Sequence, residues 1–67
     1  MEKNNVSACC RRYAKAFRKH RQNPSPLMTA FMHEERSILL EKIGYVATTK
    51  ILIALEEHII KQMEKGR

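Results

Sequence analysis

The sequence has little of what usually stabilises a small domain. Its 67 residues include no tryptophan, two glycines, two prolines and two cysteines. The cysteines, Cys9 and Cys10, are adjacent, so they do not form the spaced framework of a disulfide-rich secreted domain. We therefore expect a single small domain of marginal stability, with free thiols in a reducing cytoplasm.

Long apolar runs are also missing. No segment approaches the roughly 20 apolar residues that a membrane-spanning helix needs. The polar start of the chain, residues 1–5, and the early Arg11 do not match a signal peptide. Because Gly44 and Gly66 are its only glycines, the chain has no Gly-rich phosphate-binding loop. These absences predict a cytoplasmic protein without a membrane span.

The residues able to carry chemistry lack the spacing that catalysis or metal binding requires. The cysteines and histidines are Cys9, Cys10, His20, His33 and His58. No two of them repeat as C-x-x-C or H-x-x-x-H. The acidic pairs at 34–35 and 56–57 are typical of solvated helix faces rather than of an acid and base couple. We predict no enzyme activity, no metal and no cofactor.

Positive charge is abundant but unevenly placed. The net charge is +6, yet residues 27–67 contain six basic and six acidic residues and are neutral. Residues 1–26 contain seven basic residues and one acidic residue, so they carry the whole excess. This segregation predicts an anionic partner for the N-terminal third of the chain.

That third predicts a basic amphipathic helix over residues 6–22, preceded by disordered residues 1–5. No glycine or proline interrupts the helix, and Ser7 is a suitable N-cap. An apolar stripe at helical spacing consists of Val6, Cys10, Tyr13 and Phe17. The rest of the circumference is basic. The predicted nucleic-acid-binding residues are Arg11, Arg12, Lys15, Arg18, Lys19 and Arg21.

Lysine and arginine bind a phosphate backbone by displacing its counterions, which makes nucleic acid, DNA or RNA, the first candidate partner. Tyr13 lies among the basic residues, but its place on the apolar stripe favours packing over stacking on a base. An acidic protein surface, an anionic membrane surface and simple solubility are alternative uses of the same charge.

Residues 23–26 predict a Pro-rich turn. Pro24 cannot lie inside a helix, and it disfavours helical backbone at the preceding Asn23. Ser25 followed by Pro26 is typical of a helix start, with serine as the N-cap and proline as the first helical residue. A second helical segment is therefore expected over residues 27–65.

The second segment is predicted to break near Gly44. Its apolar residues recur every seven positions in two adjoining columns. Between these columns lie Glu35, Lys42, Thr49 and Glu56. A continuous coiled-coil seam is therefore unfavourable. We prefer a break with Gly44 as the C-terminal cap and Thr48 or Thr49 capping a third helix, and an unbroken helix is the alternative.

This segment also has more apolar residues than one small chain can cover. We predict that a helical hairpin with one broad apolar side is completed by a second copy, giving a homodimeric helical bundle. The expected dimer or partner interface is Phe31, Ile38, Leu39, Ile43, Leu52, Leu55 and Ile59. A helix from a different protein is the rival occupant of the same groove.

Familiar DNA-binding motifs fit poorly. The second helix of a helix-turn-helix must show polar side chains to bases, whereas residues 51–55 are apolar. A ribbon-helix-helix needs an alternating strand, which residues 1–10 lack. The sequence thus predicts an all-α fold, a helical hairpin or three-helix chain, and a small regulatory protein that binds nucleic acid through its basic helix. The alternative function is a protein-binding regulator, such as an adaptor, inhibitor or anti-factor.

Overall fold

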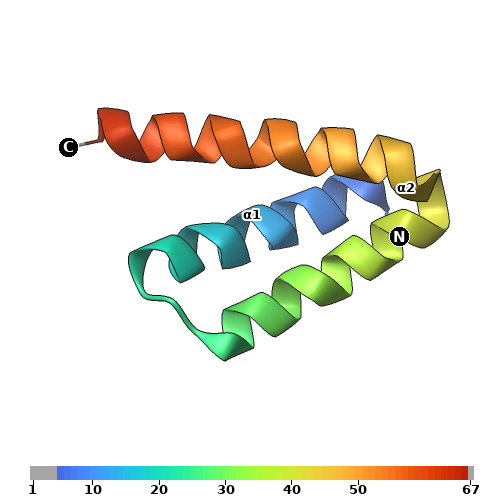
Figure 1. The fold of residues 1–67 in the computed structure, drawn as a ribbon, viewed down its shortest axis with the longest axis horizontal. Helices are drawn as coiled ribbons and strands as arrows, with labels where there is room; N and C mark the ends of the chain where they lie inside the picture. Colours follow the sequence, from blue (N-terminus) through green and yellow to red (C-terminus); the bar gives the residue numbers. More distant parts are fainter. Residues whose placement is uncertain (1–4, 67) are drawn as a thin grey trace.

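The computed structural model describes residues 5–66 and contains two helices, α1 (Val6–Gln22) and α2 (Pro26–Lys65) (Figure 1). The predicted all-α class is confirmed, and no strand occurs in the described range. α2 turns back on itself at Gly44, and we call residues 26–43 its first arm and residues 45–65 its second arm. α1 lies between the two arms and packs against both (Figure 1).

α1 begins two residues earlier than a cap at Ser7 would allow. The N-cap is Asn5, whose Oδ1 accepts a hydrogen bond from the Ala8 backbone N–H at 2.7 Å. This start places Val6 inside the helix, where it packs against the core, so the prediction of Ser7 as the cap is wrong. Of the residues predicted to be disordered, 1–4 lie outside the described range, and Asn5 is ordered as the cap.

The predicted turn and helix start at residues 23–26 are confirmed. The Ser25 side chain caps α2 by accepting a hydrogen bond from the Leu27 backbone N–H at 3.2 Å, and Pro26 is the first helical residue. A contact from α1 closes the turn, because Nδ1 of His20 accepts the Ser25 backbone N–H at 3.2 Å. The half-buried His20 therefore fixes the path from α1 to α2 instead of serving as a plain surface histidine.

The predicted interruption at Gly44 is present as a kink within α2. Gly44 has φ 84° and ψ 172°, a region of backbone space that is essentially restricted to glycine. The helix resumes at Tyr45, so neither Thr48 nor Thr49 caps the helical segment that follows the break, and that part of the prediction is wrong. Thr48 lies fully buried inside the second arm, and the turn of helix before it is what brings its side chain to the core.

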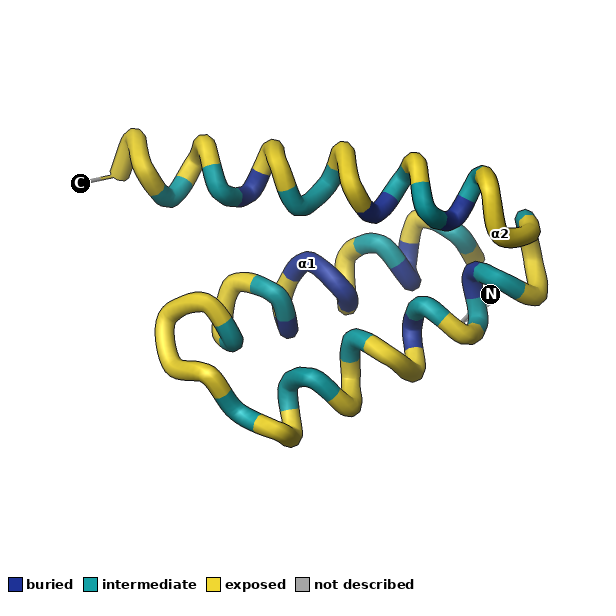
Figure 2. The backbone as a smooth tube through the Cα atoms, in the orientation of Figure 1, coloured by how far each residue is buried: buried dark blue, intermediate teal, exposed yellow. Residues whose placement is uncertain are grey.

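The core lies where α1 meets both arms (Figure 2). Its central cluster consists of Cys9, Tyr13, Leu39 and Leu52. Cys9, rather than the predicted Cys10, is the fully buried thiol, because α1 is covered on two sides and buries a broader face than a single stripe. The flanks of that face are small residues, Ala8, Ala14 and Ala16, which are all buried and allow close approach of the arms.

Most residues of the predicted dimer interface are covered within one chain. Leu39 and Ile59 are fully buried and Leu52 is 5% exposed. The partly buried Ile38, Ile43 and Leu55 pack against the same cluster. Of the predicted set, only Phe31 is exposed. α1 uses its apolar face to cover α2, which leaves less of α2 for a partner, and the dimer stays a prediction.

Candidate functional site

The basic residues of α1 form the most prominent surface of the described chain. All six predicted nucleic-acid-binding residues are exposed on α1. We define the cationic face as the four that make neither an ion pair nor a cation–π contact in the described residues: Arg11, Lys15, Arg18 and Lys19. Helical periodicity places these positions on one side of the helix, opposite the buried Cys9 and Tyr13.

The cationic face keeps its charge available. Within residues 5–66, Lys15, Arg18 and Lys19 have no ion-pair partner, and Arg11 donates only to the neutral Ser7 hydroxyl at 3.3 Å. α1 itself contains no acidic residue. From residue 11 to residue 19 a helix rises by roughly 12 Å, and one strand of duplex DNA presents about three or four phosphates over that length.

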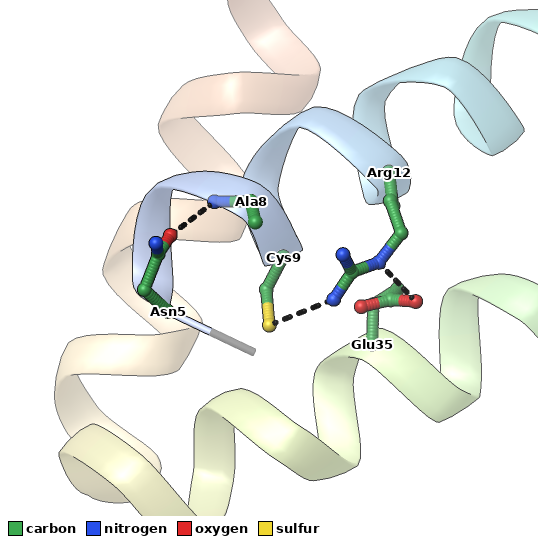
Figure 3. Close-up of polar contacts among 5 residues, drawn as sticks. All are labelled: Asn5, Ala8, Cys9, Arg12 and Glu35. Carbon is green, nitrogen blue, oxygen red and sulfur yellow. Dashed lines mark hydrogen bonds and ion pairs between the residues drawn. The ribbon is translucent and has the colours of Figure 1, made fainter. Parts of the chain in front are cut away.

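Arg12 and Arg21 differ from the cationic face. Nε of Arg12 donates to Oε2 of Glu35 on the first arm at 2.9 Å, which neutralises much of its charge locally (Figure 3). The guanidinium of Arg21 lies 5.9 Å from the centre of the Phe17 ring, in a cation–π contact that leaves the side chain exposed. The structure therefore removes Arg12 from the predicted phosphate contacts, because its carboxylate partner competes with phosphate.

A buried polar cluster at this point was missed by the sequence interpretation. Cys9, Arg12 and Glu35 lie together, and Nη2 of Arg12 donates to Sγ of Cys9 at 3.6 Å (Figure 3). Glu35 was expected on a solvated face but is 9% exposed. The sequence feature that could have revealed this burial is the position of Glu35 between the two apolar columns of α2, which places its side chain among buried residues. Its second oxygen, Oε1, lacks a well-formed hydrogen bond within the described residues.

The environment of Cys9 makes its thiol unreactive. Burial raises the pKa of the Cys9 thiol above its ordinary value of 9.0, and the negative charge of Glu35 raises it further. Burial also raises the pKa of Cys10. Because the thiolate is the nucleophile, both cysteines are poorly suited to nucleophilic chemistry at neutral pH.

Tyr13 forms the matching contact with the second arm. Its hydroxyl donates to Oε2 of Glu56 at 2.5 Å, and the side chain is 7% exposed. Burial and this hydrogen bond raise the pKa of Tyr13 well above its ordinary value. The ring also stacks on Phe17, with 6.4 Å between the ring centres. Tyr13 is therefore a core residue and does not present its face to a nucleic-acid base.

A groove of about 460 Å³ runs beside the cationic face, between α1 and the first arm. Lys15 and Lys19 line one wall, Ala16 and Met28 contribute apolar surface, and Phe31 is 44% exposed. The opposite wall includes Glu34, so the groove is of mixed charge.

The described residues include no group of three or more histidine, cysteine or acidic side chains that could hold a metal ion. Between residues 5 and 66, neither helix is long and apolar enough to cross a membrane. Comparison of the chain with models of known protein families, with curated proteins and with solved structures finds no match.

Proposed function

We propose that this protein is a small regulatory protein that binds nucleic acid through the cationic face of α1. The observation that supports the proposal is the exposure of Arg11, Lys15, Arg18 and Lys19 on one side of a single helix, with no ion pairs to α2 in the described residues. Backbone charge is what these residues recognise, so sequence preference is expected to be weak.

The number of phosphate contacts sets the salt dependence of binding. Four contacts to B-form DNA give a slope of log K against log salt of about −3.6, which corresponds to a loss of roughly a hundredfold between 50 and 200 mM salt. Arg12 is excluded from this count because of its hydrogen bond to Glu35. A slope near −5 or steeper would mean that a further contact forms, either from the exposed Arg21 or from Arg12 after its ion pair opens.

The protein-binding alternative loses part of its support. It depended on apolar surface in excess of what one chain can bury, and part of that set, such as Leu39 and Ile59, is in the core, whereas Phe31 and Ile53 stay exposed. The charge of the cationic face is unaffected by this correction. Nucleic acid is therefore the partner class that the remaining features favour.

The test compares two double variants with the same change in composition. Lys15→Ala/Lys19→Ala removes two exposed lysines from the cationic face, and Lys61→Ala/Lys65→Ala removes two exposed lysines, also four residues apart, from the second arm. Each lowers the net charge from +6 to +4. Fluorescence anisotropy with labelled random duplex DNA and with RNA, at several salt concentrations, gives the affinity and the slope.

We expect the α1 variant to reduce the magnitude of the slope by about two, while the α2 variant stays close to wild type. Equal losses in the two variants would show that net charge alone drives binding. Wild-type binding that is absent at low salt, or insensitive to salt, would overturn the proposal and direct attention to an acidic protein partner.

A further inference from the structure

The second arm of α2 leaves large apolar side chains in water. Tyr45, Val46 and Ile53 are 67%, 64% and 52% exposed. Val46 and Ile53 are seven residues apart, and the half-buried Ile60 continues the same line. The core uses the other side of this helix, through Leu52 and Ile59, and helical spacing places Val46 and Ile53 away from these two residues. The second arm alternates between buried and exposed residues along its length (Figure 2).

Charged residues alternate with this apolar line at regular spacing. The series is Val46, Lys50, Ile53, Glu57, Ile60 and Glu64. Successive members are separated by four, three, four, three and four residues, so all six lie on one face of the helix, with the apolar residues along one edge and the charged residues along the other. We call these six residues the outer seam. It is distinct from the two apolar columns that the core uses.

The order of charges along the outer seam is self-complementary in one orientation only. Lys50 lies towards the start of the arm, and Glu57 and Glu64 lie towards its end. In a parallel pair of these helices, Lys50 would lie beside another Lys50 and Glu57 beside another Glu57. In an antiparallel pair about a two-fold axis near Ile53, each Lys50 would lie opposite Glu57 of the second copy.

We infer that the outer seam binds a second copy of this chain, with the two second arms antiparallel. In this register Ile53 meets its own counterpart at the axis, and Val46 meets Ile60 of the second copy. A hollow of about 230 Å³ lined by Arg21, Ile60, Met63 and Glu64 lies at that end of the seam. It offers room for the exposed Tyr45 of the second copy.

This interface differs from the one that the sequence predicted and does not depend on the proposed nucleic-acid function. It leaves the core residues Leu39, Leu52 and Ile59 where they are. No residue of the cationic face belongs to the outer seam, so both copies keep that face. A 67-residue chain is of a size at which self-association commonly supplements a small core.

Sedimentation equilibrium of the full chain, over a wide concentration series, tests the inference. We expect a reversible monomer–dimer equilibrium that Ile53→Glu eliminates, because two buried carboxylates would meet at the axis. Leu27→Glu is the matched control, since Leu27 is 59% exposed on the first arm and outside the seam. Circular dichroism melts of both variants check that each one still folds.

Charge exchange tests the antiparallel register. The two-fold axis repeats the Lys50–Glu57 pair, so Lys50→Glu or Glu57→Lys alone is expected to raise the dissociation constant about tenfold. The double variant Lys50→Glu/Glu57→Lys should return close to wild type. A monomeric wild type, or a dimer that survives Ile53→Glu, would overturn the inference. Failure of the double variant to recover would overturn the antiparallel register.

Discussion

Arg12 and Tyr13 are neighbours on α1, but they bind different arms of α2 by different chemistry. Arg12 forms an ion pair with Glu35 on the first arm, and its own side chain is 42% exposed. Tyr13 donates a neutral hydroxyl to Glu56 on the second arm and is almost fully buried. Both acceptors are glutamates between the apolar columns of α2. The comparison teaches that burial of the donor, rather than its charge, decides how much each contact contributes.

Gly44→Ala should have the largest effect, because both contacts depend on the kink that brings the arms to α1. An alanine at φ 84° and ψ 172° is strained by its own backbone, and we expect a loss of roughly 2 to 3 kcal/mol in unfolding free energy. Urea denaturation measures it. Gly66→Ala is the control, since Gly66 has φ −75° and its added Cβ would make only ordinary contacts. Equal stability of the two variants would contradict the argument.

Tyr13→Phe should follow, with a loss of about 1.5 to 2 kcal/mol, because it removes a buried hydrogen bond to a charged acceptor. Tyr45→Phe is a matched control on the second arm, where Tyr45 is 67% exposed. Urea denaturation of both variants gives their unfolding free energies. The difference between them separates the effect of the Tyr13–Glu56 hydrogen bond from the effect of removing any tyrosine hydroxyl. Similar losses in both variants would argue against a special role for the Glu56 contact.

Tyr13→Phe should also change how the stability of the fold depends on alkaline pH. Because the pKa of Tyr13 is raised in the fold, the unfolded chain releases this proton first as pH rises. The contribution of protonated Tyr13 to the unfolding free energy is complete below the ordinary pKa of 10.0 and is lost progressively above it. Cys9, whose pKa is also raised, adds a similar loss above 9.0. Tyr13→Phe should therefore lose less stability than wild type between pH 10 and 12, as unfolding curves across that range would reveal.

Arg12→Gln should have the smallest effect of the three substitutions. The Arg12 side chain is close to half exposed, so water and salt weaken its attraction to Glu35. We expect the loss to shrink in high salt, whereas the loss from Tyr13→Phe should stay nearly constant. Melting temperatures of both variants at low and high salt provide the measurement. A salt-independent loss at Arg12 would mean that the ion pair is shielded from solvent.

The parts of the fold that sequence predicted correctly depend on local signals. The Ser25–Pro26 start and the glycine at the kink act through their own backbone preferences, which require no knowledge of the rest of the chain. The predicted range of residues 6–22 agrees with α1, but its N-cap was misplaced by two residues because Asn5 and Ser7 are similar caps. Only packing distinguishes them, since the earlier start brings Val6 to the core.

Long-range pairing could not be predicted in the same way. Arg12 and Glu35 are 23 residues apart, and Tyr13 and Glu56 are 43 apart, so no spacing rule connects them. The basic residues of α1 can be recognised from composition. That Arg12 forms an ion pair with Glu35 depends on which arm of α2 faces it, and composition does not give this. The predicted dimer interface did not include the packing of α1 for the same reason, although α1 covers much of the apolar surface assigned to it.

The backbone conformation of Gly44 suits a D-amino acid better than an L-amino acid. A Cβ built on Gly44 would meet no atom within 4 Å, so space does not forbid a side chain there. The obstacle is chirality: the mirror image of this backbone conformation is an ordinary extended one for an L residue, which makes the native conformation ordinary for a D residue. A chemically synthesised chain with D-alanine at position 44 should therefore keep the kink, and should be slightly more stable than the natural chain because its unfolded state has less freedom.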